Sequence, residues 1–226
     1  MKQIERTSII LGVLALCSVL FLQFCAIADL RTDYIPTTSD EEKGRNLLQE
    51  AYVKHGGPIW ETLDSYELTV RDTFLGFVGR NGNPFPNNGI TMKAQYIPGS
   101  FNGRAIFQGN KWDQEVWGIQ SWQTYEMETP EDPVVFKKNK DAYFWLPTYQ
   151  YFIELPVRIL EANVVQYAGP AEWKGKTCER VLASWNTSEP QKDVDQYIVW
   201  INKETKVIER VEYTIREMYN FLTGSV

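Results

Sequence analysis

The chain has 226 residues, of which 43% are hydrophobic and 23% charged, and these values are ordinary for a folded protein large enough for one well-cored domain. Its formal net charge of −6 argues against binding to a nucleic-acid backbone, which requires clustered lysines and arginines. The short basic run at 137–140 is followed at once by Asp141, so we expect no nucleic-acid partner.

The N-terminal segment predicts export. A short basic stretch precedes an apolar run from Ile9 to Phe24, and Ala26-Ile27-Ala28 matches the cleavage pattern of a signal peptide, which would leave Asp29 as the first residue. The apolar run also approaches the length that spans a bilayer, so a membrane anchor retained at 9–28 is the alternative. Either way, the remainder would be periplasmic or would face the periplasm from the inner membrane.

The three cysteines favour neither lipid attachment nor a disulfide framework. Cys17 and Cys25 follow leucine and phenylalanine, whereas a lipid-attachment signal needs a small residue there. Removal of residues 1–28 would leave only Cys178, and the exported chain would then depend on its hydrophobic core for stability.

Residues 29–40 are polar and predict a linker, and 41–226 predict a single domain. Ser39 or Asp40 would cap an amphipathic helix that ends at Gly56-Gly57-Pro58.

From Asp64 onward the hydrophobic period changes to two, beginning with the segment from Ser65 to Phe74. Further short strand candidates follow at regular spacing, and their cadence predicts an antiparallel meander. Residues 79–89 are dense in glycine, asparagine and proline and predict a turn or an exposed loop, while Gly169-Pro170 predicts a turn between strands.

Two later segments complete the pattern. Residues 130–162 predict one or two short helices, interrupted at Pro147 and Pro156. In the last strand, alternate residues form a dry face that includes Val211 and Tyr213, and Glu209 falls on it as an exception. The expected fold class is mainly β (α+β): one curved antiparallel sheet with an N-terminal helix and a short helical middle.

Four stretches, LLQEAYVKHGG, QYIPGSFNGRAIF, VWGIQSWQTYE and YIVWINKETKVIERVEYT, resemble the LolA/LolB-like periplasmic lipoprotein carriers. The match covers most of residues 40–215. It implies a half-open antiparallel sheet, or incomplete barrel, around an apolar cavity that holds the acyl chains of lipoproteins in transit, without catalysis. Two features depart from the family: Ile97 stands before Pro98 where the carriers often have arginine, and the chain stops at Val226 soon after a strand, as in a shortened member or a fragment.

Aromatic residues form 14% of the chain. Most should be core, but rings beyond what a small domain can pack would line a pocket or form an exposed patch. The candidates for an apolar ligand-binding lining are Trp60, Tyr66, Leu68, Phe107, Trp117, Trp122, Phe144, Trp145, Phe152, Trp200 and Tyr213.

Signals for catalysis are weak. His55 is the only histidine and stands at a predicted helix end, and Cys178 lies in an alternating strand, so neither a nucleophile–base pair nor a zinc set is expected. We expect no cofactor, no metal and no enzyme activity. The leading hypothesis is an exported carrier or sensor of acyl chains or another apolar ligand; the alternatives are an envelope module that binds a partner protein and an enzyme acting through carboxylates.

Overall fold

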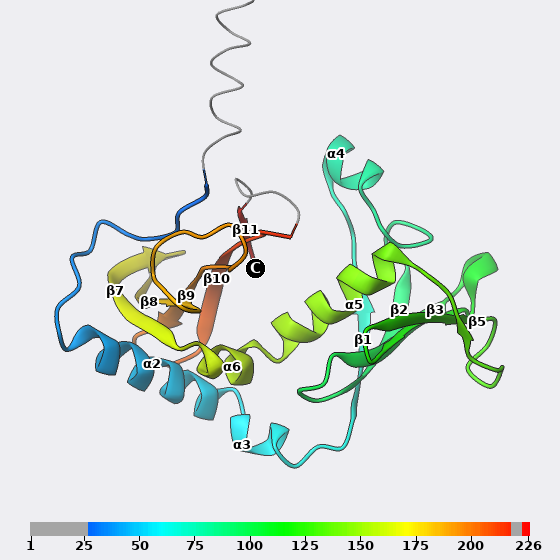
Figure 1. Ribbon diagram of the computed structural model, residues 1–226, viewed down its shortest axis with the longest axis horizontal. Helices are drawn as coiled ribbons and strands as arrows, with labels where there is room; N and C mark the ends of the chain where they lie inside the picture. The colour runs from blue at the N-terminus through cyan, green and yellow to red at the C-terminus, as the bar shows by residue number, and fades with distance from the viewer. Residues whose placement is uncertain (1–26, 218–222) are drawn as a thin grey trace, which may run out of the picture. The chain divides into compact units, whose positions relative to one another are not determined.

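The computed structural model of the chain describes residues 27–217 and 223–226 (Figure 1). The predicted signal segment or anchor therefore lies outside the described residues, apart from Ile27 and Ala28, and so do Cys17 and Cys25. Within the described part, no helix combines the length and the apolar character needed to cross a membrane.

The chain divides into two compact units. Among the described residues, unit 1 contains those up to His55 and those from Ile159 onward, and unit 2 runs from Gly56 to Arg158. The predicted mainly β, antiparallel fold with an N-terminal helix is confirmed. The strands form two sheets rather than one, and the helical segment between Lys140 and Glu161 separates them along the chain.

Unit 2 holds a six-stranded antiparallel meander in the order β1-β2-β3-β4-β5-β6. Its strands are β1 (Tyr66–Arg71), β2 (Thr91–Ile97), β3 (Asn102–Gln108), β4 (Val116–Gln120), β5 (Gln123–Met127) and β6 (Val135–Phe136). Its helices are α3 (Gly57–Trp60), α4 (Gly76–Asn81), η1 (Asn110–Trp112), α5 (Lys140–Ile153) and α6 (Leu155–Arg158).

One face of this sheet packs against α5. Strand register places Leu68, Ala94, Ala105 and Trp117 in one row across β1 to β4. The two central alanines are buried in the same core cluster as Leu146 of α5. Because alanine is small, the middle of this row leaves room for the side chains of a helix, and α5 packs there.

Two sequence predictions in unit 2 were wrong. α5 continues through Pro147, which is buried inside the helix. Proline removes a hydrogen bond within a helix, but the burial of Ala142, Leu146 and Gln150 on the same helix outweighs that loss. Residues 79–89 are also not wholly an exposed loop, because α4 extends to Asn81 and Phe85 is buried in the core.

Unit 1 holds a five-stranded antiparallel sheet in the order β11-β10-β9-β8-β7, and α2 (Asp40–Lys54) runs along β7 (Figure 1). Its strands are β7 (Val164–Trp173), β8 (Lys176–Ser184), β9 (Tyr197–Asn202), β10 (Ile208–Thr214) and β11 (Thr223–Ser225); η2 (Ile159–Glu161) precedes them. The predicted helix is confirmed from its acidic first turn to its end at His55. The cap differs, because Ser39 makes no side-chain cap bond and the carboxylate of Asp40 accepts from the N–H of Thr37.

Two β-bulges explain where the predicted alternation failed in unit 1. Gly169-Pro170 is not the turn between strands but lies at a bulge inside β7, where Gly169 has φ +85. The register of β10 shifts between Ile208 and Arg210, which places Glu209 at a bulge. Its carboxylate accepts hydrogen bonds from Lys176 and Asn202, so this acid is paired rather than stranded on a dry face.

Candidate functional site

The candidate site is the border of the apolar core in unit 2. Around the buried cluster beneath α5, eight apolar side chains pack against the core yet stay partly exposed, and we call this set the apolar rim: Tyr66, Val70, Phe74, Trp112, Trp117, Trp145, Tyr149 and Ile153. Leu68 points to the same sheet face between Tyr66 and Val70, and 37% of its surface is exposed. Partly exposed apolar groups gathered on a core can line a site for an apolar ligand.

Ring-to-ring contacts join the rim to the core. The ring of Trp145 lies edge-on to Phe74 at 5.7 Å and next to Tyr149 at 5.9 Å. Tyr149 in turn stacks on buried Phe85 at 5.8 Å. Such contacts hold the rim rings in fixed positions, so a ligand would meet a preformed surface.

The predicted lining residues divide into three groups. The structure brings together Tyr66, Leu68, Phe107, Trp117 and Trp145 on the core side of the unit 2 sheet, although Phe107 has no exposed surface.

Trp60 joins this group through its contact with Tyr66, and Phe144 through Trp145. Phe152 is a partly buried residue of α5 whose ring contacts Tyr151.

The remaining three predicted residues lie elsewhere. Trp122 occupies the β4–β5 turn and is 54% exposed. Trp200 and Tyr213 both belong to unit 1, where strand register places them on opposite faces of the sheet, Trp200 opposite Arg210 and Tyr213 opposite Tyr197. These two residues therefore cannot line one pocket together within that sheet.

A buried ion pair next to the rim was missed by the sequence reasoning. Glu154 and Arg158 are 3% and 5% exposed, and the carboxylate accepts from the guanidinium at 2.8 Å. It also accepts from the hydroxyl of Tyr66 at 2.8 Å, the side chain of Gln150 at 2.7 Å and the backbone N–H of Gly99 at 3.0 Å. The i,i+4 spacing of an acid and a base was the only available signal, and on an exposed helix the same spacing has little meaning.

This network fixes the β2–β3 turn against the helices. Gln150 donates to the carbonyl of Ile97 at 2.8 Å, and the guanidinium of Arg158 lies 3.9 Å over the ring of Phe101. Burial, followed by the hydrogen bond to Glu154, raises the pKa of Tyr66 well above its ordinary value, so this phenol stays protonated as a donor. Arg158 of α6 also donates to the carbonyl of Gly99 in this turn, at 3.5 Å.

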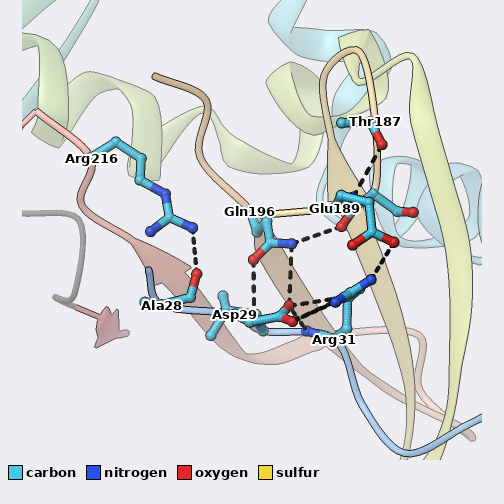
Figure 2. A network of polar contacts seen from close by, with 9 residues as sticks. Ala28, Asp29, Arg31, Thr187, Glu189, Gln196 and Arg216 are labelled. Carbon is cyan, nitrogen blue, oxygen red and sulfur yellow. Dashed lines mark hydrogen bonds and ion pairs between the residues drawn. The ribbon is translucent and has the colours of Figure 1, made fainter. Parts of the chain in front are cut away.

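The segment after the predicted cleavage position belongs to unit 1 and is held there by residues next to β9 and β10 (Figure 2). The side chain of Gln196 accepts from the N–H of Leu30 at 3.0 Å, and Arg31 pairs with Asp29 at 2.8 Å. Arg216 donates to the carbonyl oxygen of Ala28. Burial alone would raise the pKa of Asp29, but the hydrogen bonds and charge of Arg31 lower it. The residues predicted as a linker thus make defined contacts in their first part.

No protein-family model matches the chain, and no curated protein sequence matches it. Among solved structures, a DUF1329 family protein from Desulfovibrio piger matches at 10% identity and a TM-score of 0.41, covering 80% of this chain and 75% of that chain. A Vibrio parahaemolyticus domain described as belonging to outer membrane lipoprotein sorting matches at 12% identity and a TM-score of 0.41, covering 79% and 74%. The lipoprotein LppX of Mycobacterium tuberculosis matches at 12% identity and a TM-score of 0.29, covering 75% and 88%.

All three of these matches have TM-scores below 0.5. At these identities and TM-scores the matches concern the arrangement of strands and helices, and they identify no ligand.

Two observations concern metal binding and thiol chemistry. Among residues 27–217 and 223–226, no three histidine, cysteine, aspartate or glutamate side chains are grouped as a metal site. Cys178 is buried, and burial raises the pKa of its thiol, which disfavours the nucleophilic thiolate.

His55 has a structural role that predicts a pH dependence. Its Nε2 accepts a hydrogen bond from the N–H of Ile208 at 3.0 Å, and burial lowers its pKa. The folded state therefore prefers neutral imidazole, and the unfolded state binds the proton first, near a pH of about 6.5. Stability from this residue is complete above that pH and is lost as the pH falls toward the lower pKa of the folded state. We expect the urea concentration at the midpoint of unfolding to decrease as the pH is lowered from 7.5 to 5.5.

The control uses the fact that the chain has one histidine. In His55→Gln, an amide oxygen can accept the same N–H at every pH, so its urea midpoint should change less over this range. Parallel pH profiles for the two proteins would contradict the assignment.

Proposed function

We propose that the chain is an exported carrier or sensor that binds acyl chains or another apolar ligand on the apolar rim of unit 2, without catalysing a reaction. The observation that carries the proposal is the partial exposure of rim residues that already pack on the core. The sequence resemblance to lipoprotein carriers supports the same ligand class.

The chemistry of the rim suits a hydrocarbon chain. Each buried methylene contributes about 0.8 kcal/mol, so an apolar surface of this kind holds an acyl chain firmly without a specific polar contact. The rim consists mainly of aromatic rings, which bury large areas while losing little conformational freedom. The nearby Glu154 is fully engaged with its own donors, so we expect the rim to select for apolar character rather than for a charged head group.

Leu68→Asp tests the proposal. It places a carboxylate among the rim residues at a position exposed enough to leave the fold intact. The matched control is Ile35→Asp, because Ile35 lies in unit 1 and is 85% exposed. Titration with a fluorescent fatty acid should show saturable binding that is weakened roughly tenfold by Leu68→Asp and left within about twofold by the control.

Native mass spectrometry of the chain purified from the envelope gives an independent readout. A co-purified mass in the range of a lipid or fatty acid is expected. The carrier proposal would be overturned by a bare mass together with no saturable binding of any apolar probe. Capture of a defined envelope protein under those conditions would then favour the interaction module.

A further inference from the structure

A second surface of unit 2 combines exposed rings with lysines. A hollow of about 530 Å³ is lined by Trp122, Phe136 and Tyr143, by polar residues of β5 and Asn139, and by Lys137, Lys138 and Lys140. We call the three rings and three lysines the aromatic–lysine patch. The rings are 54%, 58% and 49% exposed in the order given, and the neighbouring Val134 and Val135 are also exposed. No carboxylate lines this hollow.

The backbone beneath the patch has an unfavourable conformation at an exposed tryptophan. The two-residue β4–β5 turn consists of Ser121 and Trp122, which have φ values of +49 and +61. Such turns favour asparagine and glycine, since a bulky residue with positive φ is rare and unfavourable. Strain of this kind persists where the side chain has a use, so it directs attention to what the exposed indole contacts.

Neighbouring rings hold the indole outward. Trp122 lies 5.5 Å from the ring of Phe101 and 5.7 Å from that of Tyr143 at the start of α5. Phe101 also has a positive φ, of +54, and the guanidinium of Arg158 lies over its ring. These contacts fix the positions of the exposed rings, so the rings lose little conformational freedom when a ligand binds.

The charges of the patch are available to a ligand. Lys137 pairs with Glu126 at 2.6 Å, whereas Lys138 and Lys140 are exposed and take part in no ion pair within the described residues. The whole chain has a net charge of −6, so any attraction to an anionic surface must be local. Charges act over roughly 8 Å at physiological salt, so the lysines of the patch act mainly on a surface that lies directly against it.

We infer that the aromatic–lysine patch binds the surface of an anionic phospholipid bilayer. Tryptophan and tyrosine prefer the boundary between head groups and acyl chains, and lysines beside them attract the negative head groups. Phe136 and the adjacent valines would enter the apolar side of that boundary. This inference goes beyond the proposed function, because a surface that touches a bilayer does so whether or not unit 2 carries an acyl chain.

The test measures local protection, so that insertion of the apolar segment at 9–24 does not obscure it. The full chain is mixed with vesicles of phosphatidylcholine, or of phosphatidylcholine with phosphatidylglycerol, and exposed lysines are labelled with an amine-reactive reagent and counted by mass spectrometry. Labelling of Lys138 and Lys140 should fall several-fold with the anionic vesicles alone, and 0.5 M salt should restore it. Lys203, which is exposed in unit 1, is the internal control.

Two sets of variants complete the design. Lys138→Glu with Lys140→Glu should reduce the preference for anionic over neutral vesicles roughly tenfold or more, whereas Lys192→Glu with Lys203→Glu, equal in charge but in unit 1, should not. Trp122→Gly suits the positive φ, so it should keep the urea midpoint while reducing the protection of Lys138 and Lys140 by anionic vesicles several-fold.

Equal labelling of Lys138 and Lys140 with and without anionic vesicles would overturn the inference, and so would equal effects of the two charge reversals. Loss of fatty-acid binding with protection intact would contradict the carrier proposal and leave the membrane surface standing.

Discussion

Replacement of Glu154 by alanine is expected to lower the free energy of unfolding by about 3–5 kcal/mol, among the largest effects of any single substitution in the chain. The carboxylate is 3% exposed and accepts from four groups, including Arg158. Its removal leaves a buried guanidinium without a counter-charge and the N–H of Gly99 without its acceptor. Burial of an uncompensated charge, rather than loss of attraction, accounts for most of the expected loss.

Urea denaturation followed by circular dichroism measures this loss, and a matched ion pair provides the control. Arg45 and Glu41 have the same i,i+4 spacing at 2.9 Å but are exposed, so Glu41→Ala should change stability by less than about 1 kcal/mol. Comparable losses in the two variants would show that the site around Glu154 is wetter than its burial indicates.

Phe107→Ala should lower the free energy of unfolding by about 3–5 kcal/mol, because it empties the centre of unit 2. The ring has no exposed surface and lies 5.1 Å from Trp117 and 6.2 Å from Phe85. Phe107 was predicted to line the ligand site, and its complete burial instead makes it a support for the rim. Any loss of ligand binding in this variant should therefore follow the loss of folded protein.

Phe107→Leu is the matched variant. It keeps most of the volume and should be milder than the alanine change, with a loss of about 1.5 kcal/mol or less. Thermal unfolding and fatty-acid titration on the same samples separate the two roles. An unchanged unfolding transition combined with abolished binding in Phe107→Ala would restore the lining role.

The sequence predicted the elements of this fold better than their arrangement. Helical spacing and an acidic first turn were sufficient for α2, and period-two alternation was sufficient for most strands. These signals depend on near neighbours in the chain. The division into two sheets depends on which strands pair after the helical segment, and Pro147 was misleading because its local preference was outweighed by packing on a distant strand surface.

The sequence predicted that aromatic residues would form the candidate site, but not which of them lie there. A high aromatic content indicated surplus rings, but alternation could not tell fully buried Phe107 from partly exposed Trp117. Trp122 was grouped with the lining because it is aromatic, and its positive φ could not be read from its neighbours. Glu154 escaped attention because its partners lie as far as 88 positions away along the chain, at Tyr66.

The hydrogen bond from Arg216 to the carbonyl of Ala28 makes the chain sensitive to processing at the position that follows. A cut between Ala28 and Asp29 would remove that neutral oxygen and create an ammonium group close to the guanidinium. The new ammonium group and the guanidinium of Arg216 would then repel each other where a hydrogen bond existed before. The segment from Asp29 to Tyr34 would therefore be held less tightly in the cleaved protein than in the intact one.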